Sequence, residues 1–382
     1  MRVLYVGHTY SIKANQDKIS ALTARPNIEL LLLTPDRWTG PLYTHHTDIY
    51  KGPRTDHKAL RSIFTGKESL YVFATRLKES IDSFQPDIVH VEQGTYAAVF
   101  SQVLHLCYKV SPQAKATFFT WWNLPTPIRG IKKVLEQYNL RRSACAIAGN
   151  QDAKSLLEQR GFDRPIYVMP QIGVNPDDYA IEPNEKLKQL LGLKGFVVGY
   201  VGRLAEEKGI ADLIEAMKGT TDMTLLTVGS GPMLHDINAA YKASSLRSAH
   251  VPSVRNEEIP RYLKLIDVLV LPSRKTPEWM EQFGHILIEA MAAGVPVVGA
   301  STGEIPNVIG DAGIIVRPEA PDEIRNALND LASQPELRSS LARKGIERVE
   351  AHYTHNQIAR QQIEVYDWMM REGKSIGELA RS

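Results

Sequence analysis

A chain of 382 residues is too long for one ordinary hydrophobic core, so its length predicts two domains. Hydrophobic residues make up 43% and charged residues 23%, as in soluble globular proteins, and no run of about 18 apolar residues indicates a membrane-spanning helix. The two cysteines, Cys107 and Cys145, are too few for a disulfide framework or a cysteine zinc site, and they fit a reducing cytoplasm.

The net charge of +2 is unevenly distributed along the chain. Residues 1–170 contain 22 Lys and Arg against 14 Asp and Glu, a net charge of +8, whereas residues 171–382 carry a net charge of −6. A basic first half favours an anionic partner, such as a phospholipid surface or an anionic acceptor. Ordinary solvated surface is the alternative explanation.

Short apolar runs alternate with amphipathic stretches from the N-terminus onward. The opening MRVLYVG predicts a buried first strand rather than a signal peptide. Further strands in the first half are expected at residues 28–34, 87–92, 116–122, 144–149 and 165–170, and helices at residues 69–84, 131–140 and 152–160. Strands that alternate with helices predict parallel βαβ units, and therefore an α/β fold.

The same pattern restarts in the second half. Strands are expected at residues 195–202, 223–229, 267–273, 295–300 and 312–318, and helices at residues 209–218, 257–265, 284–293, 321–333, 336–351 and 354–371. We therefore expect a first domain at 1–170, a second at 171–355, and a helical segment at 356–382 that crosses back to the first. Ligands of such doubly wound sheets bind at the carboxyl ends of the strands, so functional residues are expected in the turns that follow them.

The turn after the strand at 195–202 contains two cations. The strand ends at Gly202, Arg203 and Lys208 follow in the loop, and a helix opens at Gly209. Cations beside a helix N-terminus form an anion site, and a diphosphate fits it. The alternative is a surface loop in which Glu206 and Glu207 neutralise both cations.

Glycines also follow the strand at 223–229. Gly229 and Gly231 resemble part of a dinucleotide fingerprint, but Leu234 stands where the third glycine would be. A tight turn that lines a nucleotide site is therefore favoured over NAD binding. The sequence has no P-loop motif, so a P-loop kinase or ATPase is not supported.

Two glutamates frame the stretch EQFGHILIE. Glu281 precedes the expected helix, and Glu289 flanks a buried stripe within it that includes Leu287 and Met291. A carboxylate beside a buried stripe needs partners, and the vicinal hydroxyls of a ribose would satisfy both of its oxygens.

Five segments in this order resemble a known family. VGRLAEEKG, VGSGPM, DVLVLPS, EQFGHILIEAMAAGVPVV and STGEIPNVIGDAGIIV, over residues 198–316, resemble the retaining glycosyltransferases of family 4, also called glycosyl transferases group 1. The resemblance implies the GT-B fold, in which two Rossmann-like, doubly wound parallel-sheet domains face each other across a cleft. It also implies transfer of a hexosyl or N-acetylhexosaminyl group from a nucleotide-diphosphate sugar to an acceptor hydroxyl, with retained configuration, as in the synthesis of polysaccharides, glycolipids or small glycosides.

The resemblance also implies roles for matching positions in the second half. Arg203 and Lys208 would hold the donor diphosphate beside Gly202 and Gly229, and Glu281 would contact the donor sugar. Glu289 would bind the ribose. Further donor contacts would come from the helix-start amides and from a loop near the base, at Phe283, Gly284, His285, Ile286, Val254 and Arg255. For His285 the backbone is favoured over the side chain as the contributing group.

The first half departs from the family pattern, so its site residues are acceptor-side candidates only. Where many relatives have paired glycines, this chain has Gly7 followed by His8. Where many carry a histidine that faces the donor sugar, the loop contains Trp121, Trp122 and Asn123, and the two tryptophans either stack on sugar or pack in the interior. Glu92 ends another strand.

The partners follow from the same reasoning. We expect a nucleotide-diphosphate sugar, with UDP favoured and GDP possible as the nucleotide, together with an unidentified acceptor, no cofactor, no metal and no nucleic acid. The basic first domain predicts peripheral contact with the anionic inner face of a membrane by a protein that is otherwise cytoplasmic. An epimerase or phosphorylase of the same fold, or a non-catalytic sugar-nucleotide-binding protein, are the alternatives.

Overall fold

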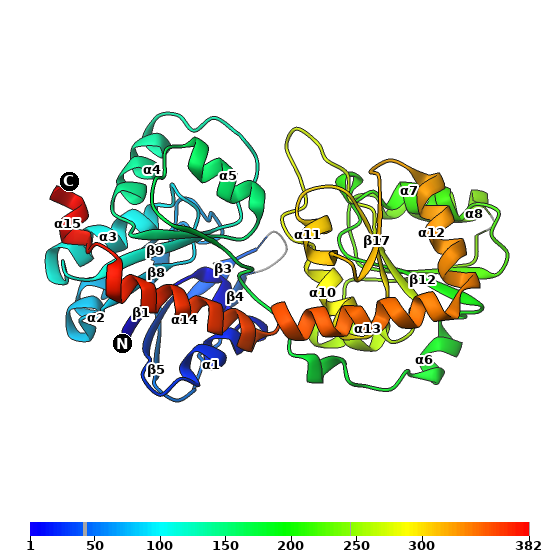
Figure 1. Ribbon diagram of the computed structural model, residues 1–382, viewed down its shortest axis with the longest axis horizontal. Helices are drawn as coiled ribbons and strands as arrows, with labels where there is room; N and C mark the ends of the chain where they lie inside the picture. Colours follow the sequence, from blue (N-terminus) through cyan, green and yellow to red (C-terminus); the bar gives the residue numbers. More distant parts are fainter. Residues whose placement is uncertain (41–43, 245, 382) are drawn as a thin grey trace. The chain divides into compact units, whose positions relative to one another are not determined.

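The computed structural model describes residues 1–40, 44–244 and 246–381. The chain divides into two compact units (Figure 1). Unit 1 consists of Met1–Ile172 and His355–Ser382, and unit 2 consists of Gly173–Thr354. Each unit is built on its own parallel sheet. None of the helices in the described ranges is both long enough and apolar enough to cross a membrane.

The sheet of unit 1 has seven parallel strands in the order β11-β10-β9-β8-β1-β2-β5. The strands are β1 (Arg2–Val6), β2 (Glu29–Pro35), β5 (Thr55–Leu60), β8 (Ile88–Val91), β9 (Lys115–Thr120), β10 (Cys145–Ala148) and β11 (Ile166–Val168). Two small antiparallel pairs accompany it: β3 (Arg37–Thr39) with β4 (Thr44–His46), and β6 (Ser62–Ile63) with β7 (Val72–Phe73).

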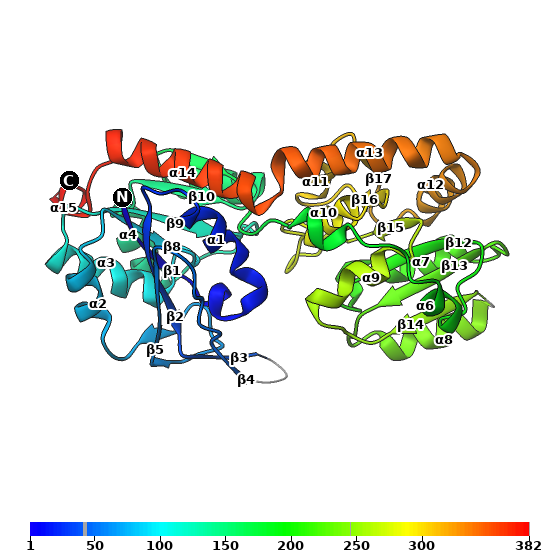
Figure 2. The same cartoon turned by 90° about the horizontal axis from the view of Figure 1, so that it is seen from below.

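Helices cover both faces of this sheet, because alternate strand residues point to opposite sides. Leu4 and Val6 belong to one buried cluster, whereas Val3 and Tyr5 belong to another. The first cluster packs under α2 (Leu77–Phe84), α3 (Ala98–Val110), α4 (Ile131–Arg141), α5 (Gln151–Gln159) and α15 (Ile376–Arg381). The second packs under α1 (Asp17–Thr23) and α14 (His355–Glu372), which lie side by side (Figure 2).

Unit 2 repeats this architecture with six parallel strands in the order β14-β13-β12-β15-β16-β17. They are β12 (Phe196–Val201), β13 (Met223–Val228), β14 (Ser248–Val251), β15 (Val268–Leu271), β16 (Val297–Ala300) and β17 (Gly313–Val316). Its helices are α6 (Glu185–Leu190), α7 (Ile210–Met217), α8 (Leu234–Ser244), α9 (Ile259–Leu263), α10 (His285–Ala292), α11 (Ile305–Ile309), α12 (Pro321–Ser333) and α13 (Pro335–His352).

The structure corrects one expectation for unit 1 and shows one strand of its main sheet that was not expected. The helix expected at residues 69–84 begins only at Leu77, because the backbone of Phe73 is held in β7 by both ends of the Gln102 side-chain amide, at 2.9 and 2.7 Å. Arg76, with φ of 59°, then turns the chain into α2. Strand β5 was not expected, because TDHKAL contains no continuous apolar run.

Candidate functional site

The carboxyl ends of the unit 2 strands form a tightly packed set of turns. A Cβ atom at Gly229 would lie 1.9 Å from the Gly202 carbonyl oxygen, so the turns after β13 and β12 approach as closely as only glycine permits. Gly209 has φ of +69°, and a Cβ atom there would lie 1.9 Å from the Pro272 carbonyl oxygen. The turn that carries Lys208 is therefore held against the end of β15.

Lys208 and Glu281 meet at this edge of the sheet. The Lys208 Nζ atom lies 2.7 Å from Glu281 Oε2, and the Ser273 hydroxyl donates to the same oxygen at 2.9 Å. The ring centre of Trp279 lies 4.6 Å from the Lys208 ammonium. We call Lys208, Ser273, Trp279 and Glu281 the lysine cluster. It combines a cation and a carboxylate that are 73 positions apart in the sequence.

Arg203 stands beside this cluster. Its guanidinium pairs with the Glu207 carboxylate, and its backbone carbonyl accepts a hydrogen bond of 2.7 Å from the Tyr200 hydroxyl. Burial raises the pKa of Tyr200, and the nearby Glu281 carboxylate raises it further. The Arg203 side chain is 57% exposed and can therefore exchange Glu207 for an anionic ligand. Of the two neighbouring glutamates, Glu207 pairs with Arg203, whereas Lys208 pairs with Glu281 instead.

Helix α10 carries the second glutamate. Gly284, with φ of +78°, turns the chain into the helix between buried Phe283 and half-buried Ile286. Glu289 Oε1 lies 3.1 Å from His285 Nδ1, one helical turn away. Burial raises the pKa of Tyr179, and the charge of Glu289 adds to this shift. The His285 side chain therefore has a carboxylate partner, which was not expected.

Val254 and Arg255 lie in the loop after β14. The Ser253 amide donates to Ser230 Oγ at 3.1 Å, so this loop is tied to the turn that contains Gly229. Val254 is half-buried. The Arg255 side chain is 79% exposed, with its Nε atom 3.7 Å from Glu258.

In unit 1, Gly7 and His8 lie directly after β1. A Cβ atom at Gly7 would lie 3.3 Å from the Glu92 Cβ atom. The His8 ring stacks on Trp38 at a centroid distance of 4.1 Å, and His8 Nδ1 lies 2.6 Å from the Gln93 side-chain amide. Burial lowers the pKa of His8 to about 4, so its imidazole is neutral near pH 7.

Glu92 lies inside unit 1 and is saturated by protein groups. It is 3% exposed and accepts hydrogen bonds from Lys18 at 2.8 Å, Tyr10 at 2.7 Å and Gln171 at 2.7 Å, as well as one from Tyr5. By itself burial would raise the pKa of Glu92, but the charges of Lys18 and His90, together with hydrogen bonds from Lys18 and Tyr5, outweigh burial and lower it. Its contacts are those of an internal ion pair rather than of a group facing an acceptor.

The loop after β9 places its two tryptophans, Trp121 and Trp122, in different surroundings. The Trp121 indole N–H donates to Gln171 Oε1 at 2.9 Å, and the ring covers Gly149, where a Cβ atom would lie 2.0 Å from it. Trp122 is half-buried, and its indole nitrogen has no hydrogen-bond partner in the described part of the chain. Asn123 is 5% exposed.

Sequence reasoning missed several residues of these sites. Ser273 ends a recognised strand segment, so its position at the carboxyl edge of the sheet was the available signal. Trp279 precedes Glu281 by two residues but had no pattern to mark it. Lys18 and Gln171 come from distant segments and donate hydrogen bonds to Glu92, and only the folded structure shows these contacts.

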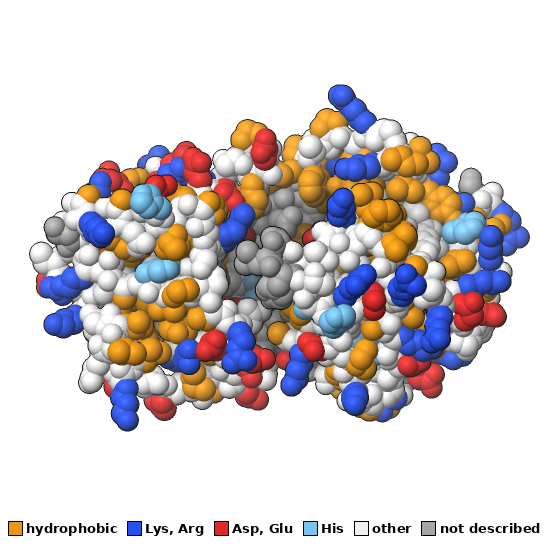
Figure 3. Space-filling model, turned by 180° about the vertical axis from the view of Figure 1, so that it is seen from behind, with side chains coloured by type: hydrophobic (Ala, Val, Ile, Leu, Met, Phe, Trp, Pro, Cys, Tyr) orange, Lys and Arg blue, Asp and Glu red, His pale blue; other side chains and the backbone are white. Residues whose placement is uncertain are grey.

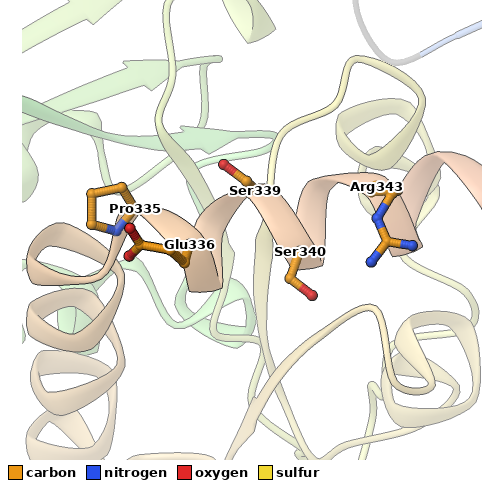
Figure 4. Close-up of a pocket in the computed structure, with 5 residues that line it drawn as sticks. All are labelled: Pro335, Glu336, Ser339, Ser340 and Arg343. Carbon is orange, nitrogen blue, oxygen red and sulfur yellow. The ribbon is translucent and has the colours of Figure 1, made fainter.

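A hollow on α13 carries no comparable chemistry. It is lined by Pro335, Glu336, Ser339, Ser340 and Arg343, and Figure 4 shows these side chains pointing in different directions from one helix. Within the described ranges, no group of three or more His, Cys, Asp or Glu side chains is arranged to hold a metal ion. The turns of unit 2 therefore remain the candidate site.

Comparison with known sequences finds a family match for part of the chain. Residues 182–348, which lie within unit 2, match the family described as glycosyl transferases group 1. The chain is similar to 2-deoxystreptamine glucosyltransferase from Streptomyces kanamyceticus, with 31% identity over 216 residues, 53% of this chain and 54% of that protein. The chain thus spans about half the length of the curated relatives it matches.

Comparison with solved structures covers nearly the whole chain. Sucrose-phosphate synthase from Thermosynechococcus elongatus matches 96% of this chain and 98% of its own, with a TM-score of 0.70 and 20% identity. HepE from Anabaena, solved in complex with UDP, matches 96% of this chain and 100% of its own, with a TM-score of 0.72 and 17% identity. These likenesses show the GT-B fold, with two Rossmann-like parallel-sheet domains.

Proposed function

We propose that this chain, whose unit 2 contains a glycosyl transferases group 1 domain, moves a sugar from a nucleotide-diphosphate sugar to an acceptor hydroxyl. The observation that carries the proposal is the meeting of Lys208 and Glu281 at the carboxyl end of the sheet, where Lys208 belongs to the same turn after β12 as Arg203. Two cations there match the charge of a diphosphate, and a carboxylate matches sugar hydroxyls. UDP is the favoured nucleotide, since HepE was solved with it, and GDP is the second choice.

Within this proposal the residues of unit 2 take separate tasks. Arg203 and Lys208 hold the diphosphate and stabilise the negative charge that grows on it as the bond to the anomeric carbon breaks. Glu281 binds donor-sugar hydroxyls, and Glu289 binds the ribose. The amides at the start of α10, from Phe283 to Ile286, face the phosphates, and Val254 and Arg255 lie near the base.

The stereochemical proposal is transfer with retention. The acceptor oxygen attacks the anomeric carbon on the face that the diphosphate leaves, and the acceptor proton passes to a departing phosphate oxygen. Two protein cations take the charge-stabilising part, so we propose that turnover needs no divalent metal. We expect full activity in the presence of EDTA. We also expect the NMR spectrum of the product to show the anomeric configuration of the donor.

The experiment that tests the function is a donor screen followed by turnover. UDP, GDP and ADP sugars are tested by thermal shift, where a ligand at about 100 times its dissociation constant stabilises the protein by about 2.7 kcal/mol. The donor that binds is then incubated with and without candidate acceptors. Epimerised sugar, or turnover that requires inorganic phosphate, would replace this proposal with an epimerase or a phosphorylase. Binding without turnover under any of these conditions would indicate a non-catalytic binding protein.

A second proposal concerns a membrane partner for unit 1. Phe64, Leu70, Ile131 and Val134 are 60, 46, 70 and 58% exposed. Arg61, Lys67, Arg129 and Lys132 are exposed close to them in the sequence. The Ala98 amide donates to the Ser69 carbonyl at 3.0 Å, and Lys132 lies over the Tyr96 ring, so the two segments border the same loop. Hydrophobic and basic side chains also lie together on the face of unit 1 seen in Figure 3.

Apolar side chains surrounded by cations suit the surface of an anionic bilayer. We expect the protein to bind liposomes that contain phosphatidylglycerol at low salt and to dissociate as the salt concentration rises. Absence of binding at low salt would refute this partner while leaving the proposed donor chemistry untouched.

A further inference from the structure

The segment that leads from β15 to Glu281 is pinned to unit 2 near its start. The Arg274 guanidinium forms two hydrogen bonds with the Asp212 carboxylate, at 2.8 and 2.6 Å. The Arg274 amide donates to the Glu207 carbonyl at 2.8 Å. A bidentate, largely buried pair of this kind fixes direction as well as distance. The loop therefore leaves the sheet in a defined direction.

The middle of the loop is closed on itself. The Thr276 amide donates to the Trp279 carbonyl at 2.8 Å, and the Trp279 amide donates back to the Thr276 carbonyl at 3.4 Å. Pro277 occupies the second position of this four-residue turn, where its fixed φ is favourable. The backbone of Trp279 is therefore held in place by local structure and is independent of its ring.

The Trp279 ring contacts the lysine of the lysine cluster. Its centre lies 4.6 Å from the Lys208 Nζ atom, within the range of a cation–π interaction, while Glu281 Oε2 lies 2.7 Å from the same atom. The ring is only half-buried and is absent from the hydrophobic core clusters of unit 2 that the structure describes. Core packing therefore does not explain its position.

We infer that Trp279 is a positioning residue for Lys208, a role that rests on the function proposed above. A lysine side chain has four rotatable bonds, so the ammonium needs more than one contact to stay in place. Glu281 supplies one contact and the Trp279 ring face supplies the other. A second carboxylate would hold the ammonium equally well, but together with Glu281 it would give the cluster a net negative charge, which would repel the donor diphosphate. The neutral ring fixes the position and adds no negative charge.

The first test compares Trp279→Leu with Trp279→Phe. Leucine removes the ring electrons and keeps an apolar side chain, so UDP binding measured by calorimetry and kcat/KM for the donor should each fall about 3- to 30-fold. Phenylalanine keeps a ring face and should restore most of both values. Equal values for Trp279→Leu and the wild type, at equal thermal stability, would overturn the inference.

The second test separates positioning from a general structural effect by a double-mutant cycle. In the Lys208→Met background, Trp279→Leu should change UDP binding no further, because the group that Trp279 positions is gone. If the two substitutions are instead additive, the ring acts independently of Lys208 and the inference is wrong.

The same calorimetry distinguishes this inference from the proposed function. A wild type that binds none of UDP, GDP and ADP overturns the donor assignment and the role of Trp279 together. A wild type that binds UDP, with additive substitutions, overturns only the role of Trp279.

Discussion

Both cations of the candidate site have carboxylate partners within unit 2. Arg203 pairs with Glu207 and Lys208 pairs with Glu281. Exposed pairs of this kind contribute little to stability, so Arg203 would lose little free energy if a diphosphate replaced Glu207 as its partner. The Lys208 side chain is only 19% exposed and is better held. The two cations therefore differ: the exposed Arg203 side chain can move to meet a ligand, whereas the Lys208 side chain is already held in position.

Replacing either cation should weaken turnover far more than stability. For Arg203→Ala and Lys208→Ala, kcat/KM for the donor should fall about 100-fold or more, because under the proposed function each removes a charge that stabilises the departing diphosphate. Lys275→Ala is the matched control, since Lys275 is an exposed cation in the loop that precedes Glu281, and its activity should be unchanged. Near-normal turnover in both variants would contradict the site.

At the residue scale, the sequence located candidate side chains at strand ends but did not predict which groups surround them. The strand-end rule placed Lys208 and Glu281 at the same edge of the sheet, and the structure brings them together. The same rule marked Glu92 as an acceptor-side candidate, yet Glu92 is buried against Lys18. A strand end can face a ligand or the interior. The choice depends on partners such as Lys18 and Gln171, whose proximity no local pattern encodes.

His57 should make unit 1 sensitive to acid. Its Nδ1 atom accepts from the Tyr50 amide at 2.8 Å and its Nε2 atom lies 2.9 Å from the Thr34 hydroxyl, so the neutral ring uses both nitrogens. Burial lowers the pKa of His57 to about 4, against the opposing charge of Asp56. Between an unfolded pKa of about 6.5 and this value, only the unfolded chain binds the proton. Stability is thus full above pH 6.5 and is lost as the pH falls toward 4.

The size of this effect is up to about 3 kcal/mol in the free energy of unfolding. Urea unfolding at pH 7 and pH 4.5 measures it. In a Trp279→Phe background all four remaining tryptophans lie in unit 1, so fluorescence follows that unit alone. His57→Gln should reduce the loss between the two pH values. An undiminished loss in that variant would assign the sensitivity to other groups, such as His8.

At the scale of elements, a regular apolar pattern did not fix the bounds of a helix, and a strand with few apolar residues offered no pattern to predict. The helix expected at 69–84 has the right spacing of apolar residues, but the Gln102 side chain captures the backbone at Phe73 and only the second half is helical. Strand β5 is an edge strand whose TDHKAL has polar residues, so its register beside β2 comes from backbone pairing. Tertiary contacts decided both cases, and neither is visible in a local window.

Helix α14 is tied into unit 1 by a buried polar contact. The Tyr366 hydroxyl lies 2.7 Å from His90 Nδ1 and also accepts from the Gln362 amide. Tyr366→Phe should lower the free energy of unfolding of unit 1 by about 1–3 kcal/mol, because it leaves buried polar groups without a partner. Asp367→Asn, a change at the exposed neighbouring position, should have little effect. Equal urea midpoints for the two variants would show that α14 is held by apolar packing alone.

For the whole molecule, the two units differ in what their sequences reveal. The family match at residues 182–348 lies entirely in unit 2, whose turns carry the recognisable motifs. Unit 1 has the same architecture but is recognised through its layout, because a buried parallel strand needs only apolar residues of suitable size. Fold could therefore be predicted for both units, whereas candidate site residues could be given specific roles only in unit 2, where ligand chemistry restricts the residue type.

The chain order of the units leads to a final prediction. Unit 2 is one continuous segment, Gly173–Thr354, with its own six-stranded sheet, its own buried cluster and the whole lysine cluster. Residues 173–354 produced alone should therefore fold cooperatively and bind UDP, with binding reduced by Lys208→Ala, but should transfer no sugar. Unit 1 is discontinuous in sequence, and Tyr366 and Met369 of α14 complete the core beneath α1. In a fragment of residues 1–354, which lacks α14, we therefore expect residues 1–172 to be unfolded. Circular dichroism and calorimetry on the two fragments measure this. An unfolded 173–354 fragment would show that unit 2 depends on unit 1 for its stability.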